Sequence, residues 1–141
     1  MLRGSYSVEI DRNTPSDFWW KVPMNFLTDE LREQLISNFN ENRELSDSGK
    51  DEADFRPILK LFTPGGNATW LLTEMDEESC LAFGLCDLGL GFPEVGWVSL
   101  EELAAVRDGL GLPVERDLHF VASKTLREYA EEAADLGRVV A

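Results

Sequence analysis

The fold is decided by residues 59–120, LKLFTPGGNATWLLTEMDEESCLAFGLCDLGLGFPEVGWVSLEELAAVRDGLGLPVERDLHF. This stretch contains both cysteines, the only histidine and most of the glycines of the chain. Its apolar runs are separated by turn signals rich in glycine, proline and asparagine, which is the pattern of short strands joined by tight turns. We therefore expect the core, and any functional site, to be built on this stretch.

The apolar runs predict an antiparallel β-meander. Residues 56–63 and 68–75 flank a Pro-Gly-Gly-Asn turn and predict a hairpin. Residues 80–86 predict a third strand, in which Gly84 marks a bulge or a close backbone approach. Further short strands are predicted at residues 5–11, 95–98 and 118–121.

Three amphipathic segments predict helices. Thr28 is an N-cap candidate for a helix that reaches about Asn40. Ser99 and Thr125 each begin a capping-box pattern, with glutamate three positions later. We expect the helix after Ser99 to end at Gly109 or Gly111, and the helix after Thr125 to end at Gly137.

Together these elements predict one α+β domain over residues 1–141. The meander has about four to six strands, with about three helices packed on one face. Residues 41–54 have almost no apolar content and predict a mobile acidic loop.

Charge is the strongest compositional signal. Asp and Glu number 27 against 13 Lys and Arg, which gives a net charge of −14. Such a surface repels phosphate backbones and anionic lipids, so direct binding to nucleic acid or to a membrane surface is disfavoured. A basic protein is the partner that this charge suits. No apolar run is long enough to cross a membrane and the N-terminus lacks a secretory pattern, which predicts a cytoplasmic protein.

The two cysteines predict neither a disulfide nor a metal site. Cys80 and Cys86 lie on one predicted strand, about 20 Å apart at about 3.3 Å per residue. That distance exceeds the reach of a disulfide, so we expect free thiols in a reducing compartment. Two cysteines and His119 do not supply the four ligands of a structural zinc site. We expect no metal and no cofactor.

Cys86 and His119 are the candidates for enzymatic chemistry. A cysteine nucleophile with a histidine base and an orienting acid, here Asp87 or Glu94, would suit a hydrolase or a transferase. The apolar neighbours of Cys86 instead favour a buried, unreactive thiol.

The triplet Glu115-Arg116-Asp117 is the most prominent polar cluster of this region. It could bind a ligand, but we expect Arg116 to hold the turn through bidentate hydrogen bonds to neighbouring oxygens.

Exposed aromatic and acidic side chains are the candidates for partner binding. Three adjacent aromatics at residues 18–20 cannot all point inward from one helix or strand, so at least one packs under a loop or reaches a partner. Two acidic runs add carboxylates that could steer the protein onto a positive groove. The predicted partner-binding residues are Trp19, Trp20, Asp51, Glu52, Asp54, Asp76, Glu77 and Glu78.

Several motifs of the stretch resemble a small bacterial family of unknown function. They are LFTP at 61–64, NATW at 67–70, FGL at 83–85, GFPEVGWVSLEEL at 91–103 and GLPVERDLHF at 111–120. Members of that family are often carried on plasmids, phages and integrative conjugative elements. The resemblance implies a cytoplasmic accessory protein of mobile DNA, a setting in which anti-restriction and anti-CRISPR functions are common.

Three functional hypotheses follow. The first is a non-enzymatic inhibitor that mimics nucleic acid and occludes a basic, nucleic-acid-binding surface of a host defence complex. The second is a small cysteine-dependent hydrolase or transferase that uses Cys86 and His119. The third is a structural accessory subunit of a conjugation-related assembly.

Overall fold

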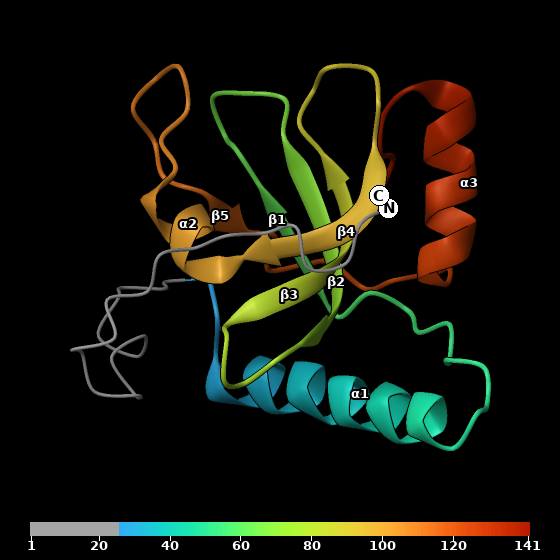
Figure 1. Cartoon of the computed structure of the whole chain (residues 1–141). Coiled ribbons are helices and arrows are strands. Elements are labelled where there is room, and N and C mark those ends of the chain that lie inside the picture. Colours follow the sequence, from blue (N-terminus) through green and yellow to red (C-terminus); the bar gives the residue numbers. More distant parts are fainter. Residues whose placement is uncertain (1–25) are drawn as a thin grey trace.

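The computed structural model of the chain describes residues 26–141, which form an α+β domain with a five-stranded antiparallel sheet. The strand order is β4-β3-β2-β1-β5. The predicted fold class is confirmed. The elements in chain order are α1 (Asp29–Asp47), β1 (Leu59–Phe62), β2 (Thr69–Met75), β3 (Leu81–Asp87), β4 (Glu94–Ser99), α2 (Leu100–Ala105), β5 (Glu115–Arg116) and α3 (Leu126–Leu136) (Figure 1).

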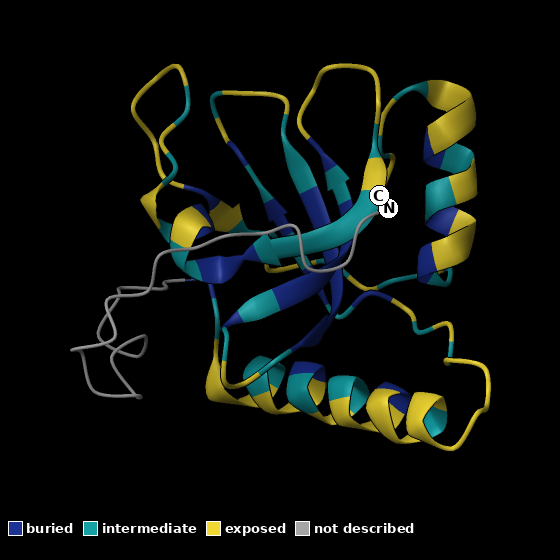
Figure 2. Cartoon of the chain, viewed as in Figure 1, coloured by how far each residue is buried: buried dark blue, intermediate teal, exposed yellow. Residues whose placement is uncertain are grey.

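The helices cover both faces of the sheet, so the prediction that they all pack on one face is wrong. Strand alternation divides β2, because Trp70 and Leu72 face one apolar cluster and Leu71 faces another. The first cluster includes Leu35 of α1 together with Leu100 and Leu103 of α2, whereas the second includes Leu126, Tyr129 and Ala133 of α3. Figure 2 shows the buried strands between the helices. A sheet with apolar residues on both faces needs cover on both.

Helix α1 is longer than predicted. It continues to Asp47, so residues 41–47 of the predicted acidic loop are helical. The cause is Asn42, which is buried and donates to the carboxylate of Glu74 on β2 at 3.1 Å. A tertiary hydrogen bond therefore holds a helical turn whose outer residues are polar and exposed. Residues 48–58 contain no helix or strand.

Two other boundaries differ from the prediction. The last strand is Glu115–Arg116, and residues 118–121 are not a strand, because the carboxylate of Asp117 accepts the His119 N–H at 2.9 Å and turns the chain. Helix α2 ends at Ala105, before Gly109, since Asp108 accepts main-chain N–H groups of the following loop. The predicted strand at residues 5–11 lies outside the described residues.

The three predicted helix N-caps are confirmed. Thr28, Ser99 and Thr125 each accept a main-chain N–H three residues on, and Thr125 forms a complete capping box with Glu128. Gly137 ends α3 in a left-handed conformation, as expected. No helix of residues 26–141 is long and apolar enough to cross a membrane.

Candidate functional site: an acidic helix face and an open hollow

The outer face of α1 carries several exposed carboxylates. Its exposed carboxylates are spaced so that most of them share one side of the helix, where neighbours three or four positions apart lie about 5–6 Å apart. There are six of these carboxylates, and none of them makes an ion pair within residues 26–141. They are Asp29, Glu30, Glu33, Glu41, Glu44 and Asp47, and we call them the acidic face. Figure 2 shows that one side of α1 is exposed along its length.

The acidic face is not explained by helix stability. Asp29 and Glu30 lie at the helix N-terminus, where carboxylates interact favourably with the helix dipole. Asp47 lies in the last turn, which carries no basic residue, so its charge opposes the dipole. The helix dipole therefore accounts for Asp29 and Glu30 but not for Asp47.

The two acidic runs predicted for partner binding lie at opposite ends of α1. Near its N-terminal end, Glu77 pairs with Arg32 at 2.9 Å. Near its C-terminal end, Asn42 holds Ala53 of the other run through its main-chain N–H at 2.7 Å. A 19-residue helix is about 28 Å long, so the two runs are too far apart to form one patch together. The acidic face adds carboxylates near both ends of the helix between them.

Some carboxylates of these runs form hydrogen bonds that stabilise the local structure. Asp76 accepts hydrogen bonds from the Glu78 N–H at 3.1 Å and from the Ser79 hydroxyl at 2.9 Å, which shapes the turn between β2 and β3. Asp54 accepts the main-chain N–H of Arg127 at 3.1 Å and so binds the start of α3. Asp51, Glu52 and Glu78 are exposed. Trp19 and Trp20 lie outside the described residues.

Cys86 and His119 are placed on opposite faces of the sheet. Cys86 packs against the cluster that includes Leu35 and pairs in register with Trp70 and Glu94. His119 lines an open hollow on the other face. Burial raises the pKa of the Cys86 thiol to about 12, with a further contribution from Glu94. The structure therefore does not bring the predicted nucleophile and base together.

Cys80 is also a buried thiol, and its pKa is raised to about 12, chiefly by burial. Both cysteines are free, as the sequence predicts. In residues 26–141 no group of three or more His, Cys, Asp or Glu side chains is arranged to hold a metal ion.

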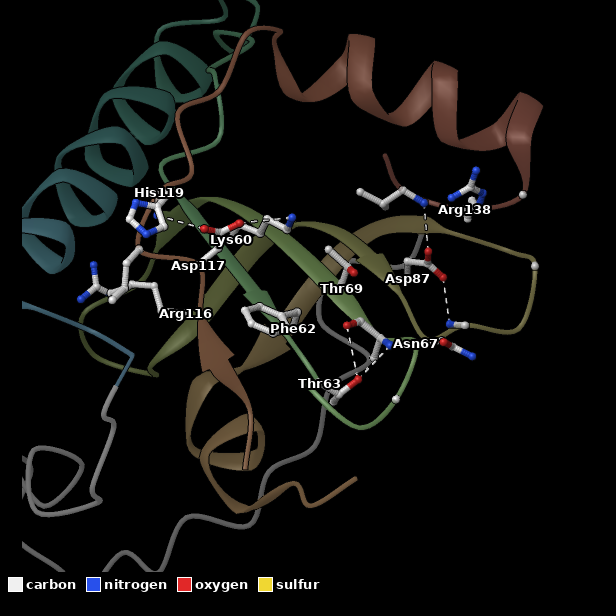
Figure 3. A pocket seen from close by; sticks show the side chains of 17 residues that line it. Lys60, Phe62, Thr63, Asn67, Thr69, Asp87, Arg116, Asp117, His119 and Arg138 are labelled. Atoms are coloured by element: carbon white, nitrogen blue, oxygen red, sulfur yellow. Dashed lines mark hydrogen bonds and ion pairs between the residues drawn. The ribbon is translucent and has the colours of Figure 1, made fainter. Parts of the chain in front are cut away.

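The Glu115-Arg116-Asp117 cluster is organised by Asp117 and not by Arg116. Asp117 accepts the His119 N–H at 2.9 Å and lies 3.4 Å from the ammonium of Lys60. The bidentate pairing expected of Arg116 is absent from the described part of the chain, where its buried Nε has no hydrogen-bond partner. The reason is register: Arg116 pairs with Leu61, and its side chain points away from Phe62 (Figure 3).

The hollow that His119 lines has a volume of about 880 Å³. Its floor is one row of the sheet, in which Phe62 pairs with Thr69 and Thr69 pairs with Asp87. The next row, Leu71 paired with Leu85, is covered by α3. The hollow is therefore the part of this face that α3 does not reach.

Sequence reasoning missed both the acidic face and the hollow. The spacing of Glu30, Glu33, Glu41 and Glu44 was a usable signal for the acidic face, but the shorter predicted helix obscured it. The alternation of residues in β1 does predict that Lys60 and Phe62 lie on one face of the sheet. Which row of that face stays uncovered depends on how far α3 reaches, and the sequence does not show this.

The comparisons with known proteins agree with the predicted family resemblance. A family model described as a protein of unknown function, DUF2958, matches residues 26–140. Neither a curated protein nor a solved structure matches the chain. The match spans the whole described domain except its last residue. The chain therefore belongs to the DUF2958 family, whose function is unknown.

Proposed function

We propose that this protein is a non-enzymatic binding protein that uses the acidic face of α1 to occlude a basic, nucleic-acid-binding surface of a partner protein. The observation that carries the proposal is the set of six exposed carboxylates on one side of a helix about 28 Å long, none of which is ion-paired within residues 26–141. An acidic run lies near each end of this helix. A rigid row of negative charges is a suitable substitute for a nucleic-acid backbone in a positive groove.

Electrostatics defines how such a complex would form. The net charge of −14 attracts a basic partner over a distance set by the salt concentration, because the Debye length is about 8 Å at physiological ionic strength. Association would be fast at low salt and slower as salt rises. Carboxylates at the edge of the interface would contribute more to the association rate than to the final affinity.

The finer part of the proposal is that the partner belongs to a host defence system, as in an anti-CRISPR or anti-restriction inhibitor. Its support is the resemblance to proteins carried on mobile elements together with the acidic face. The placement of Cys86 and His119 on opposite faces of the sheet, and the raised pKa of the thiol, favour this function over the cysteine-dependent enzyme.

The experiment is an affinity capture from lysate of the native host with three matched baits. They are the full chain, an acidic-face variant (Glu41→Gln, Glu44→Gln) and a control variant that also removes two charges, at exposed positions of α3 (Glu131→Gln, Asp135→Asn). We expect the full chain and the α3 variant to retain one basic nucleic-acid-binding protein, which the acidic-face variant loses and which high salt elutes.

The retained protein is then tested for competition. Added full chain should displace a DNA or RNA oligonucleotide from it, whereas the acidic-face variant should not. Equal retention by the acidic-face variant, or binding that does not weaken as salt rises, would rule out the proposed surface.

A further inference from the structure

The open hollow beside β1 has the features of a small-molecule site, independent of the acidic face. Its volume of about 880 Å³ lies within the range of ligand pockets in proteins. Three walls surround the floor of Phe62, Thr69 and Asp87. They are the turn between β1 and β2, the segment around Asp117, and the chain after Gly137 (Figure 3).

The carboxylates of the hollow are occupied by the protein itself. Asp87 is buried, and its two oxygens accept the N–H groups of Gly89 at 2.8 Å and Val139 at 2.9 Å. Asp117 accepts the His119 N–H and lies beside Lys60. These acids hold the walls in place, since each oxygen of Asp87 accepts a main-chain N–H and Asp117 is engaged by His119 and Lys60.

The hydrogen-bonding side chains that remain are rich in donors. Within residues 26–141, no hydrogen bond or ion pair is made by the guanidinium of Arg138, the amide of Asn67 or the hydroxyl of Thr69. Arg138 offers donors only, and the other two offer donors beside acceptors. In Figure 3, Thr69 lies between Lys60 on one side and Arg138 on the other, with Asp87 between Thr69 and Arg138 and with Asn67 below them. Such a set suits a ligand with several acceptor oxygens and negative charge.

Phe62 supplies the apolar part of the site. Its ring lies on the floor and is half-buried, with Thr69 beside it in register. A planar ring of a ligand can stack on a phenyl face of this kind. Charges more than about 8 Å away are largely screened at physiological salt, so the overall charge of −14 acts on a bound anion mainly through the nearby Asp87 and Asp117.

From these contacts we infer that the hollow binds a nucleoside phosphate, with the base stacked on Phe62 and the phosphate held by Arg138. The exposed part of the Phe62 ring is the reason to expect a planar base, and the donor side chains are the reason to expect a phosphate. Neither element takes part in the acidic face, so the inference stands or falls separately from the proposed function.

The test is a two-dimensional NMR titration of the full chain with AMP and UMP, and with adenosine and inorganic phosphate as part-ligands. Both nucleotides should shift the amide signals of residues 62–69, 87–91 and 137–139, and each part-ligand should bind at least about tenfold more weakly than AMP. Arg138→Gln should weaken AMP binding about tenfold or more, because a charge-assisted hydrogen bond is lost.

Two further variants separate this role from a general effect of charge. Phe62→Leu keeps the floor apolar but removes the ring, so it should abolish the preference for AMP over inorganic phosphate. Arg43→Gln removes an exposed arginine on α1 and should leave binding unchanged. The inference is overturned if AMP causes no shifts at about 10 mM, if the shifts lie outside the three segments, or if Arg138→Gln binds AMP as tightly as the original chain.

Discussion

A Cβ atom at Gly84 of β3 would lie 1.9 Å from the carbonyl oxygen of Leu71 on β2. The two strands approach this closely beside a register shift between Leu72 and Glu74. The bulge turns Met75 toward the α1 side of the sheet. Glycine is required at position 84 because the neighbouring backbone lies where a Cβ atom would be.

Gly84→Ala should therefore destabilise the fold. The added methyl group meets backbone and not a movable side chain, so the strands must separate, at a cost of about 1–3 kcal/mol or more. The free energy of unfolding in urea measures the change. Gly109→Ala is the matched control, because nothing lies within 4 Å of its added Cβ, and it should change stability by less than about 0.5 kcal/mol. Equal effects of the two variants would contradict the close approach.

Asn42→Ala should destabilise the protein and loosen the segment after α1. The variant removes a hydrogen bond to the buried Glu74 carboxylate and leaves the Ala53 N–H without its acceptor, which costs about 1–3 kcal/mol. Urea unfolding gives the stability, and hydrogen exchange of the Ala53 amide reports the local effect. Asn40→Ala, at an exposed position of the same helix, should be neutral within about 0.5 kcal/mol. Slow exchange at Ala53 in the Asn42 variant would show that another contact holds the segment.

Asp117 should make stability depend on pH in the acid range. The His119 N–H lowers the pKa of its carboxyl, desolvation opposes this, and Lys60 lowers the pKa further. Because the folded state holds the proton less tightly, the stabilisation is present above the ordinary pKa of about 3.9 and is lost as pH falls through the lower folded value. Asp117→Asn should thus reduce the urea midpoint at about pH 7 and reduce it less at about pH 2.5. The same difference at both pH values would exclude this linkage.

Both cysteines should resist alkylation in the folded protein at neutral pH. With a pKa of about 12, each thiol has roughly a thousandfold less thiolate than an ordinary exposed cysteine, and Cys80 is only 2% exposed. Labelling with iodoacetamide, followed by mass spectrometry of the two peptides, measures the rates. Unfolding in urea should make both fast. Rapid labelling of Cys86 alone in the folded state would instead support the cysteine-dependent enzyme.

Patterns local in sequence predicted the fold well. The hairpin over β1 and β2 and the caps at Thr28, Ser99 and Thr125 depend on neighbouring residues, and each is found in the structure. The end of α1 was not predictable in this way, because its last turns are held by the contact between Asn42 and Glu74, 32 positions apart. The turn after Asp117 likewise replaced a strand that the apolar residues 118–121 had suggested.

The sequence by itself determined the fold class, the strand and helix types, the free thiols and the acidic character of this protein, because periodicity, capping and charge are properties of short segments. Only the tertiary structure decided that the helices cover both faces, that Cys86 and His119 lie on opposite faces of the sheet, and that Phe62, Thr69 and Asp87 form an uncovered floor. Strand order, register and the reach of α3 set these relationships, and they arise from contacts between residues distant in the chain.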